Sequence, residues 1–167
     1  MPGPGGLGLV SPDTSKIYNS LVAPYNSAER LPFTPGQVLW NRDGTKAYRF
    51  ALMTVGAATA GSMLAFSTAG DRYTVIAGTT DLPAAGLCVT AITQDYYGWI
   101  QVRGLNDVAM VTDGNVTIDD RCSLTTGNDI KPATEAEMVG GAVCGTSLAA
   151  DTGTALAIGL FRLECPA

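Results

Sequence analysis

The side chains that most often perform chemistry in proteins are scarce and scattered in this chain of 167 residues. It contains no histidine, which excludes Ser-His-Asp and Cys-His pairs and the common Cys/His zinc sites. The four cysteines, Cys88, Cys122, Cys144 and Cys165, are far apart and form no CxxC motif. We therefore expect reduced, mostly buried thiols that pack as small apolar side chains, with two disulfides as the alternative.

Two further motifs could hold a ligand, and neither has the context that it needs. Residues 3–8 match GxGxxG, but no strand precedes them and Pro4 lies inside the motif, so we expect no dinucleotide site. Asp113, Asp119 and Asp120 lack the spacing of a calcium loop, and we interpret them as a solvated acidic turn. The sequence thus predicts no catalytic residue, no cofactor and no metal, although a spatial pair of carboxylates would escape this test.

The composition limits the classes of partner. A net charge of −5 and a pI near 4.5 give no basic surface for nucleic acid. The sequence contains no run of about 18 apolar residues, so no membrane span is predicted. Only 15% of residues are charged, against about 25% on average. Part of the surface is therefore expected to be covered by other protein, unless this is simply an Ala/Gly-rich domain. Residues 1–6 lack the basic and apolar regions of a signal peptide, so we expect synthesis in a reducing cytoplasm.

The arrangement of apolar residues predicts an all-β fold. Between Gln37 and Glu164, short apolar bursts end at Gly, Asp or Asn, as in the strands of a compact β-barrel or jelly-roll-like sandwich. This β domain is assigned to residues 37–167. One short helix is expected near Ala133–Met138, where Thr134 and Glu137 could form a capping box. The expected strands are Lys46–Met53, Ser62–Phe66, Arg72–Ala77, Gly86–Thr93, Tyr97–Arg103, Asp107–Val111, Asn115–Ile118, Arg121–Leu124, Met138–Cys144 and Thr154–Leu163.

Residues 1–36 are predicted to form an extended arm. They hold six of the nine prolines, which remove ladder donors and so exclude a central strand or a long helix. The arm is nevertheless too apolar to stay in water, and it should pack on its own domain, on a sister subunit or on another protein. A disordered leader is the alternative. The arm residues expected to contact a capsid or a neighbouring subunit are Ile17, Tyr18, Leu21, Val22, Tyr25, Leu31 and Phe33.

One expected strand, Tyr97–Arg103, has an unusual face. Alternation places Ile100 and Val102 on the core side, and the other face then carries Tyr97, Trp99, Gln101 and Arg103. Tyr, Trp and Arg are enriched in protein interfaces. We interpret this face as an interface with another subunit or with a capsid. The alternative is that Trp99 is a core residue and that the two faces are reversed.

The residues Gly86-Leu-Cys-Val-Thr-Ala-Ile-Thr, followed after a short turn by Tyr97-Gly-Trp-Ile-Gln-Val-Arg-Gly104, resemble a strand pair of the decoration proteins of tailed bacteriophages, also called cement or head-stabilisation proteins. The likeness covers about residues 36–163, and residues 1–35 lie outside it. It implies a compact β domain, usually a homotrimer, that sits on the outer capsid surface between capsomers of the major capsid protein. It implies no catalysis and no cofactor.

The expected function is therefore that of a structural virion protein that stabilises the shell lattice across capsomer seams. An alternative is a glycan- or receptor-binding β domain of a virion fibre, in which Tyr97 and Trp99 would stack on sugar rings. A small barrel enzyme is a further alternative, disfavoured by the absence of histidine.

Overall fold

In the computed structural model, the described regular elements are strands apart from one short helix and one 3₁₀ turn. The described residues are 11–67, 71–77, 82–113, 115–125, 129–139, 143–150, 157–158 and 161–165. Within them the strands are β1 (Tyr18–Asn19), β2 (Val38–Trp40), β3 (Ala47–Val55), β4 (Met63–Phe66), β5 (Thr74–Ala77), β6 (Ala84–Cys88), β7 (Tyr96–Leu105), β8 (Met110–Val111), β9 (Arg121–Leu124), β10 (Ile130–Pro132), β11 (Val143–Ser147), β12 (Ala157–Ile158) and β13 (Phe161–Glu164). A 3₁₀ turn, η1 (Ala28–Arg30), and a short helix, α1 (Glu135–Val139), complete the described elements.

Five of these strands close into a barrel. β3 pairs with β7, β7 with β6, β6 with β4 and β4 with β5, all antiparallel, and the parallel pairing of β5 with β3 closes the ring. Closure leaves these strands without a free edge inside the ring. The all-β, barrel-type fold predicted from the sequence is thereby confirmed.

The two long strands β3 and β7 carry apolar side chains on both faces. On β7, Ile100 and Val102 belong to the main core, whereas Tyr97 and Trp99 belong to a second, aromatic cluster. β3 shows the same alternation. The period of two along a strand therefore divides these residues between an inner core and an outer aromatic layer, as the sequence predicts for the two faces of β7.

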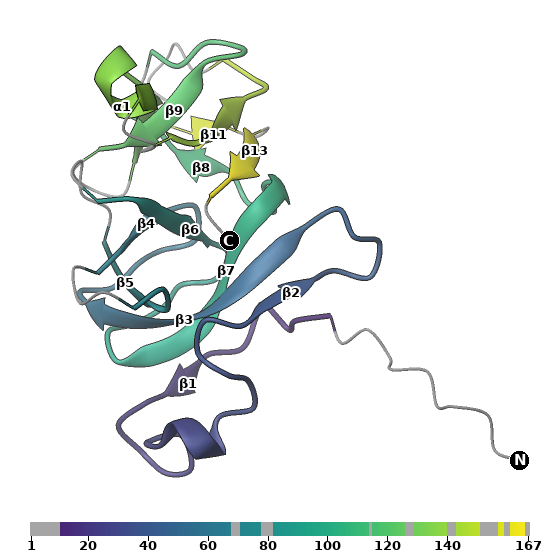
Figure 1. Cartoon of the computed structure of the whole chain (residues 1–167), viewed down its shortest axis with the longest axis vertical. Coiled ribbons are helices and arrows are strands. Elements are labelled where there is room, and N and C mark those ends of the chain that lie inside the picture. Colours follow the sequence, from purple (N-terminus) through teal and green to yellow (C-terminus); the bar gives the residue numbers. More distant parts are fainter. Residues whose placement is uncertain are drawn as a thin grey trace, which may run out of the picture.

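A second group of strands extends the sheet beyond the barrel. β13 pairs with the end of β7, and β11, β9 and β10 follow in order. Figure 1 shows this group with α1 at one end of the molecule, and β1 and η1 at the opposite end, beneath β3 and β7. No helix among the described residues is long and apolar enough to cross a membrane.

The predicted helix and its cap are confirmed. The Thr134 backbone N–H donates to Oε2 of Glu137 at 2.7 Å, and the Glu137 N–H donates to Oγ1 of Thr134 at 3.3 Å, which is a reciprocal capping box. These hydrogen bonds, together with Lys131 at 3.0 Å, lower the pKa of Glu137 to about 2. The carboxylate is therefore ionised throughout the neutral range and complements the start of the helix.

Several predicted strand boundaries are wrong. Met138 lies within α1 (Glu135–Val139), so the strand expected over Met138–Cys144 begins only at Val143. Asn115–Ile118 forms no described strand beyond a bridge at Val116. Part of Thr154–Leu163 lies outside the described residues, and the rest forms β12 and β13. Arg121–Leu124 is a strand with the predicted bounds.

All four cysteines are free and buried, as predicted. Burial raises the pKa of Cys88, Cys122 and Cys165 to about 12, and it raises that of Cys144 as well. A thiol with so high a pKa is protonated at neutral pH and reacts slowly, because the thiolate is the nucleophile.

These thiols should link stability to alkaline pH. Their ordinary pKa is 9.0, so above about pH 9 the unfolded chain releases protons that the folded chain retains. The contribution of these thiols to the free energy of unfolding should be complete below pH 9. As the pH rises from about 9 to about 12, it should be lost at about 1.4 kcal/mol per pH unit for each buried thiol. Denaturation series from pH 8 to 11 measure this slope, and Cys88→Ala should reduce it. Rapid labelling of the native thiols with a disulfide reagent at pH 8 would contradict their burial.

Candidate protein interface

The outer face of β3 and β7 is an aromatic layer. The register places Phe50 opposite Trp99 and Leu52 opposite Tyr97. The Phe50 ring stacks on Tyr97 with centroids 5.4 Å apart and lies 5.2 Å from Trp99. Aromatic pairs at these distances stabilise a fold beyond the area that they bury. This layer is the surface on which the remaining candidate residues are arranged.

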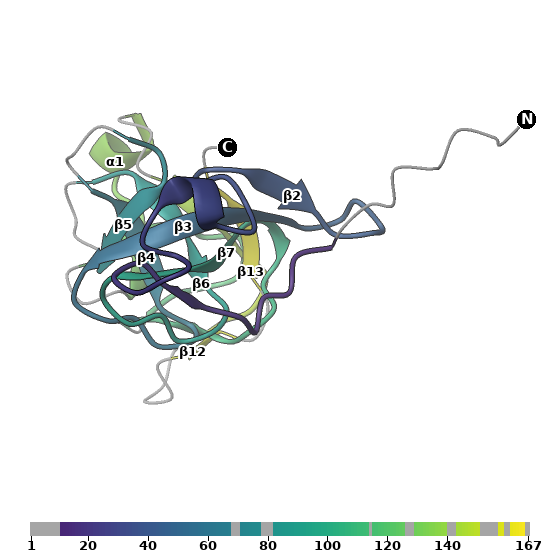
Figure 2. The same ribbon diagram turned by 90° about the horizontal axis from the view of Figure 1, so that it is seen from below.

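The N-terminal segment covers the aromatic layer. Phe33 packs edge-on against both Trp99, at 4.8 Å, and Phe50, at 5.6 Å, and Tyr18 packs edge-on against Phe50 at 5.8 Å. Leu31 packs against the same cluster. Trp99 is consequently 1% exposed. Figure 2, seen from below, shows η1 and its flanking loops in front of β3.

Backbone hydrogen bonds hold this cover in register with the barrel. β1 pairs with β7, with Tyr18 opposite Tyr97. On the β3 side, the Gly36 N–H donates to the Phe50 carbonyl at 2.8 Å, and the Phe50 N–H donates to the Gln37 carbonyl at 2.9 Å. The segment is therefore tied to both strands of the aromatic layer rather than extended away from them.

This arrangement corrects the expectation of an exposed face formed by Tyr97, Trp99, Gln101 and Arg103. Tyr97, Trp99 and Gln101 are buried within the chain, and only Arg103 is exposed. The alternation of β7 was predicted correctly, but a second layer from the same chain lies over the aromatic face. The stacking of sugar rings on Tyr97 and Trp99, which the glycan-binding alternative requires, is blocked in this fold.

Gln101 serves a structural purpose at the end of this face. Its Nε2 donates to the Leu105 carbonyl at 2.6 Å, and its Oε1 accepts from the Asp107 N–H at 2.9 Å. Asp107 in turn accepts a hydrogen bond from the Tyr48 hydroxyl at 2.5 Å and forms an ion pair with Lys46. Burial, and then this carboxylate, raise the pKa of Tyr48. The network fixes the turn that follows β7.

The predicted contact residues of the arm fall into two groups. Tyr18, Leu31 and Phe33 pack on the aromatic layer, and Tyr25 packs edge-on against Tyr18 at 5.0 Å. The second group, Ile17, Leu21 and Val22, is exposed, with Leu21 at 68% and Val22 at 52%. We call Leu21 and Val22 the arm loop. The first group is half-buried, so the second group offers a partner the more exposed apolar surface.

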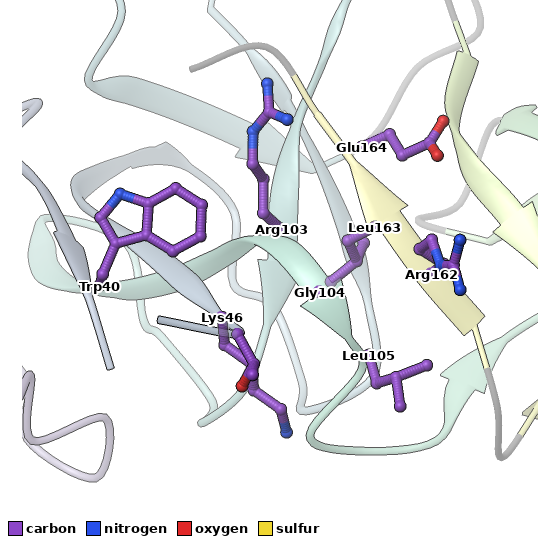
Figure 3. Close-up of a pocket in the computed structure, with 9 residues that line it drawn as sticks. Trp40, Lys46, Arg103, Gly104, Leu105, Arg162, Leu163 and Glu164 are labelled. Atoms are coloured by element: carbon purple, nitrogen blue, oxygen red, sulfur yellow. The ribbon is translucent and has the colours of Figure 1, made fainter. Parts of the chain in front are cut away.

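An open groove lies at the opposite end of β3, where β7 meets β13. Its volume is about 500 Å³. Trp40, 46% exposed, and Leu105, 43% exposed, contribute apolar surface. Figure 3 shows Trp40 on one side of the groove and the residues of β13 on the other, with Arg103 between them. We call this surface the Trp40 groove; its lining residues are Trp40, Thr45, Lys46, Arg103, Gly104, Leu105, Arg162, Leu163 and Glu164.

A glycine shapes the floor of the groove. Gly104 has φ +91°, a conformation that L side chains rarely adopt, and a Cβ there would lie 2.3 Å from the Thr45 carbonyl oxygen. The glycine thus lets β7 pass close to the turn that leads into β3. The sequence pattern points to Arg103 but not to Trp40, Leu105 and Arg162, because these residues come from separate segments that only the β7–β13 and β2–β3 pairings bring together.

Comparison with known proteins gives one informative likeness. No protein-family model and no curated protein matches the sequence. Among solved structures, the chain is similar to the head fibre gp8.5 N base of bacteriophage phi29, with a TM-score of 0.50 and 13% identity, over 73% of this chain and 98% of that chain. At this identity the likeness shows a shared fold.

The cover predicts a stability difference between two residues of the same segment. Phe33→Ala removes ring contacts to Phe50 and Trp99 and, because Phe33 is only half-buried, should lower the free energy of unfolding by about 2 kcal/mol. Leu21→Ala, at an exposed position, should change it by less than about 0.5 kcal/mol. Chemical denaturation followed by circular dichroism measures both. Equal effects of the two substitutions would contradict the packing described here.

Proposed function

We propose that this chain is a structural protein of a phage virion that docks on the outer surface of the head. The observation that supports it most is the shared fold with a phage head fibre base. The strand pair of residues 86–104, which resembles decoration proteins, is a second and independent pointer. The proposed partner is the major capsid protein. The proposed role involves no catalysis and no cofactor.

The arm loop is the proposed shell contact. Leu21 and Val22 expose apolar surface, and burying such surface gains roughly 25 cal/mol per Å² before the costs of association. Those costs are reduced because the loop is already positioned: the Ser20 N–H donates to the Asp95 carbonyl at 2.8 Å, and the Leu21 N–H donates to Oδ1 of Asn19 at 2.9 Å. The loop would dock without an ordering step of its own.

Stabilisation of the shell would follow from bridging. A copy that contacts shell subunits on both sides of a seam opposes their separation when packaged DNA presses outward. Assembly as a homotrimer would join several weak contacts into one multivalent attachment. The low charge content, 15% of residues, fits a protein that is partly covered in its working state.

The second candidate function is the base of a head fibre. The likeness extends over 98% of the fibre-base chain, which favours this alternative specifically. A base must also bind the head, but it transmits no load across a seam. The two functions therefore differ in their effect on the shell rather than in their attachment.

Binding to heads tests the shared part of the proposal. The purified chain should co-sediment with expanded, undecorated phage heads. The double substitution Leu21→Ser, Val22→Ser should weaken binding about tenfold, because it removes apolar anchors from the contact. Ile118→Ser with Met138→Ser is the matched control, since these are two exposed apolar residues outside the arm. Failure of the unaltered chain to bind heads would overturn the proposal.

The thermal stability of the shell separates the two candidates. If the chain stabilises the lattice, saturating amounts should raise the melting temperature of the expanded shell, because binding to the assembled state alone stabilises it. If the chain is a fibre base seated on a single capsomer, it should bind separated capsomers as well as the assembled shell, and it should therefore leave the temperature at which the capsomers separate unchanged. Scanning calorimetry of heads with and without the protein gives the answer, with the chain's own unfolding measured separately.

A further inference from the structure

The Trp40 groove combines exposed apolar surface with a local excess of positive charge. Three cations and one anion line it: Lys46, Arg103 and Arg162 against Glu164. The chain as a whole carries −5. The groove is therefore a basic site on an acidic protein.

Two of the four charged side chains already form ion pairs with residues outside the groove. Lys46 pairs with Asp107, and Glu164 lies 3.5 Å from the Arg121 guanidinium. Neither Arg103 nor Arg162 forms an ion pair with a described residue. The register of β13 against β7 places Arg162 opposite the exposed Leu105. Arg103 stands opposite Glu164 on β13 and opposite Ala47 on β3, and Ala47 in turn is opposite Trp40. Arg and Trp together are the residue types most enriched where binding energy concentrates.

The groove and the arm loop lie at opposite ends of the same strand. The arm loop follows Ser20, which is bonded to Asp95, and the Asp95 N–H donates to the carbonyl of Met53 near the end of β3. The groove includes Thr45 and Lys46, which come immediately before β3. β3 has nine residues and spans about 30 Å. Figures 1 and 2 both show the β2–β3 turn far from β1.

We propose that the Trp40 groove binds a carboxylate-bearing, partly apolar segment of the major capsid protein and is a second shell contact, separate from the arm loop. This rests on the proposed head-binding function. A protein that bridges a seam needs two contacts at a distance from each other, and the structure offers two. Arg103 and Arg162 would each donate charge-assisted hydrogen bonds to a partner carboxylate, while Trp40 and Leu105 cover the adjacent apolar side chains.

The test is binding of groove variants to expanded heads. Arg103→Glu with Arg162→Glu should weaken co-sedimentation about tenfold or more, because it places like charges together. Trp40→Ala should weaken it about tenfold by removing the apolar anchor. Each single reversal, Arg103→Glu or Arg162→Glu, should also weaken binding, and Arg72→Glu, at an exposed position outside the groove, is the control with the same change in net charge and should bind like the unaltered chain. Circular dichroism checks folding, and Arg103→Gln with Arg162→Gln replaces the reversal if that variant unfolds.

Salt dependence gives an independent readout. Raising the ionic strength from about 50 to about 500 mM should weaken binding of the unaltered chain more than binding of the charge-reversed variant, because only the former gains from partner carboxylates. If the unaltered chain binds and the groove variants bind equally well, the inference is overturned while the head-binding function stands. If the unaltered chain does not bind, both fall.

Two other occupants would also overturn the inference. If light scattering shows that the unaltered chain is a trimer and the charge-reversed variant a monomer, the groove is a contact between copies of this chain. If soluble glycans compete for Trp40 and the arginine variants bind heads normally, the groove is a sugar site.

Discussion

The structure depends on a requirement that β3 and β7 create together: both faces of these strands must be kept from water. Their inward side chains fill the closed barrel, and their outward side chains form the aromatic layer of Tyr48, Phe50, Tyr97 and Trp99. A five-stranded ring satisfies only the first face. Aromatic side chains bury large areas, and leaving this layer exposed would forfeit several kcal/mol. Residues of the N-terminal segment satisfy the second face, so the segment acts as part of the domain.

This requirement also limits what the N-terminal segment can offer a partner. Tyr18, Leu31 and Phe33 pack on the barrel, which leaves Ile17 and the arm loop as the exposed large apolar residues of the segment. The loop is held by backbone bonds to the β7 side, so it is a preorganised contact rather than a flexible tether. β3 then separates this contact from the Trp40 groove. One strand thus positions both surfaces through which we propose that the chain attaches to a phage head.

Sequence reasoning succeeded where local periodicity decides the structure. The period of two separated Tyr97 and Trp99 from Ile100 and Val102, and Thr134 with Glu137 gave the helix cap. It failed where long-range packing decides. Nothing local to β7 reveals that Phe33, more than sixty residues earlier, covers Trp99, so from the sequence alone this buried aromatic face looks like an interface. The Trp40 groove cannot be predicted for the same reason, since Trp40 and Arg162 line one surface only because of the order in which their strands pair.

The most direct measurement is the fluorescence of Trp99 after removal of residues 1–34 in a Trp40→Phe background, where Trp99 is the remaining tryptophan. If the N-terminal segment is the cover, truncation should shift the Trp99 emission to the red, open it to acrylamide quenching and lower the melting temperature, because Phe33 and Tyr18 no longer shield the aromatic layer. A truncated chain whose Trp99 emission, quenching and melting temperature match those of the full-length Trp40→Phe variant would show that the barrel needs no such cover.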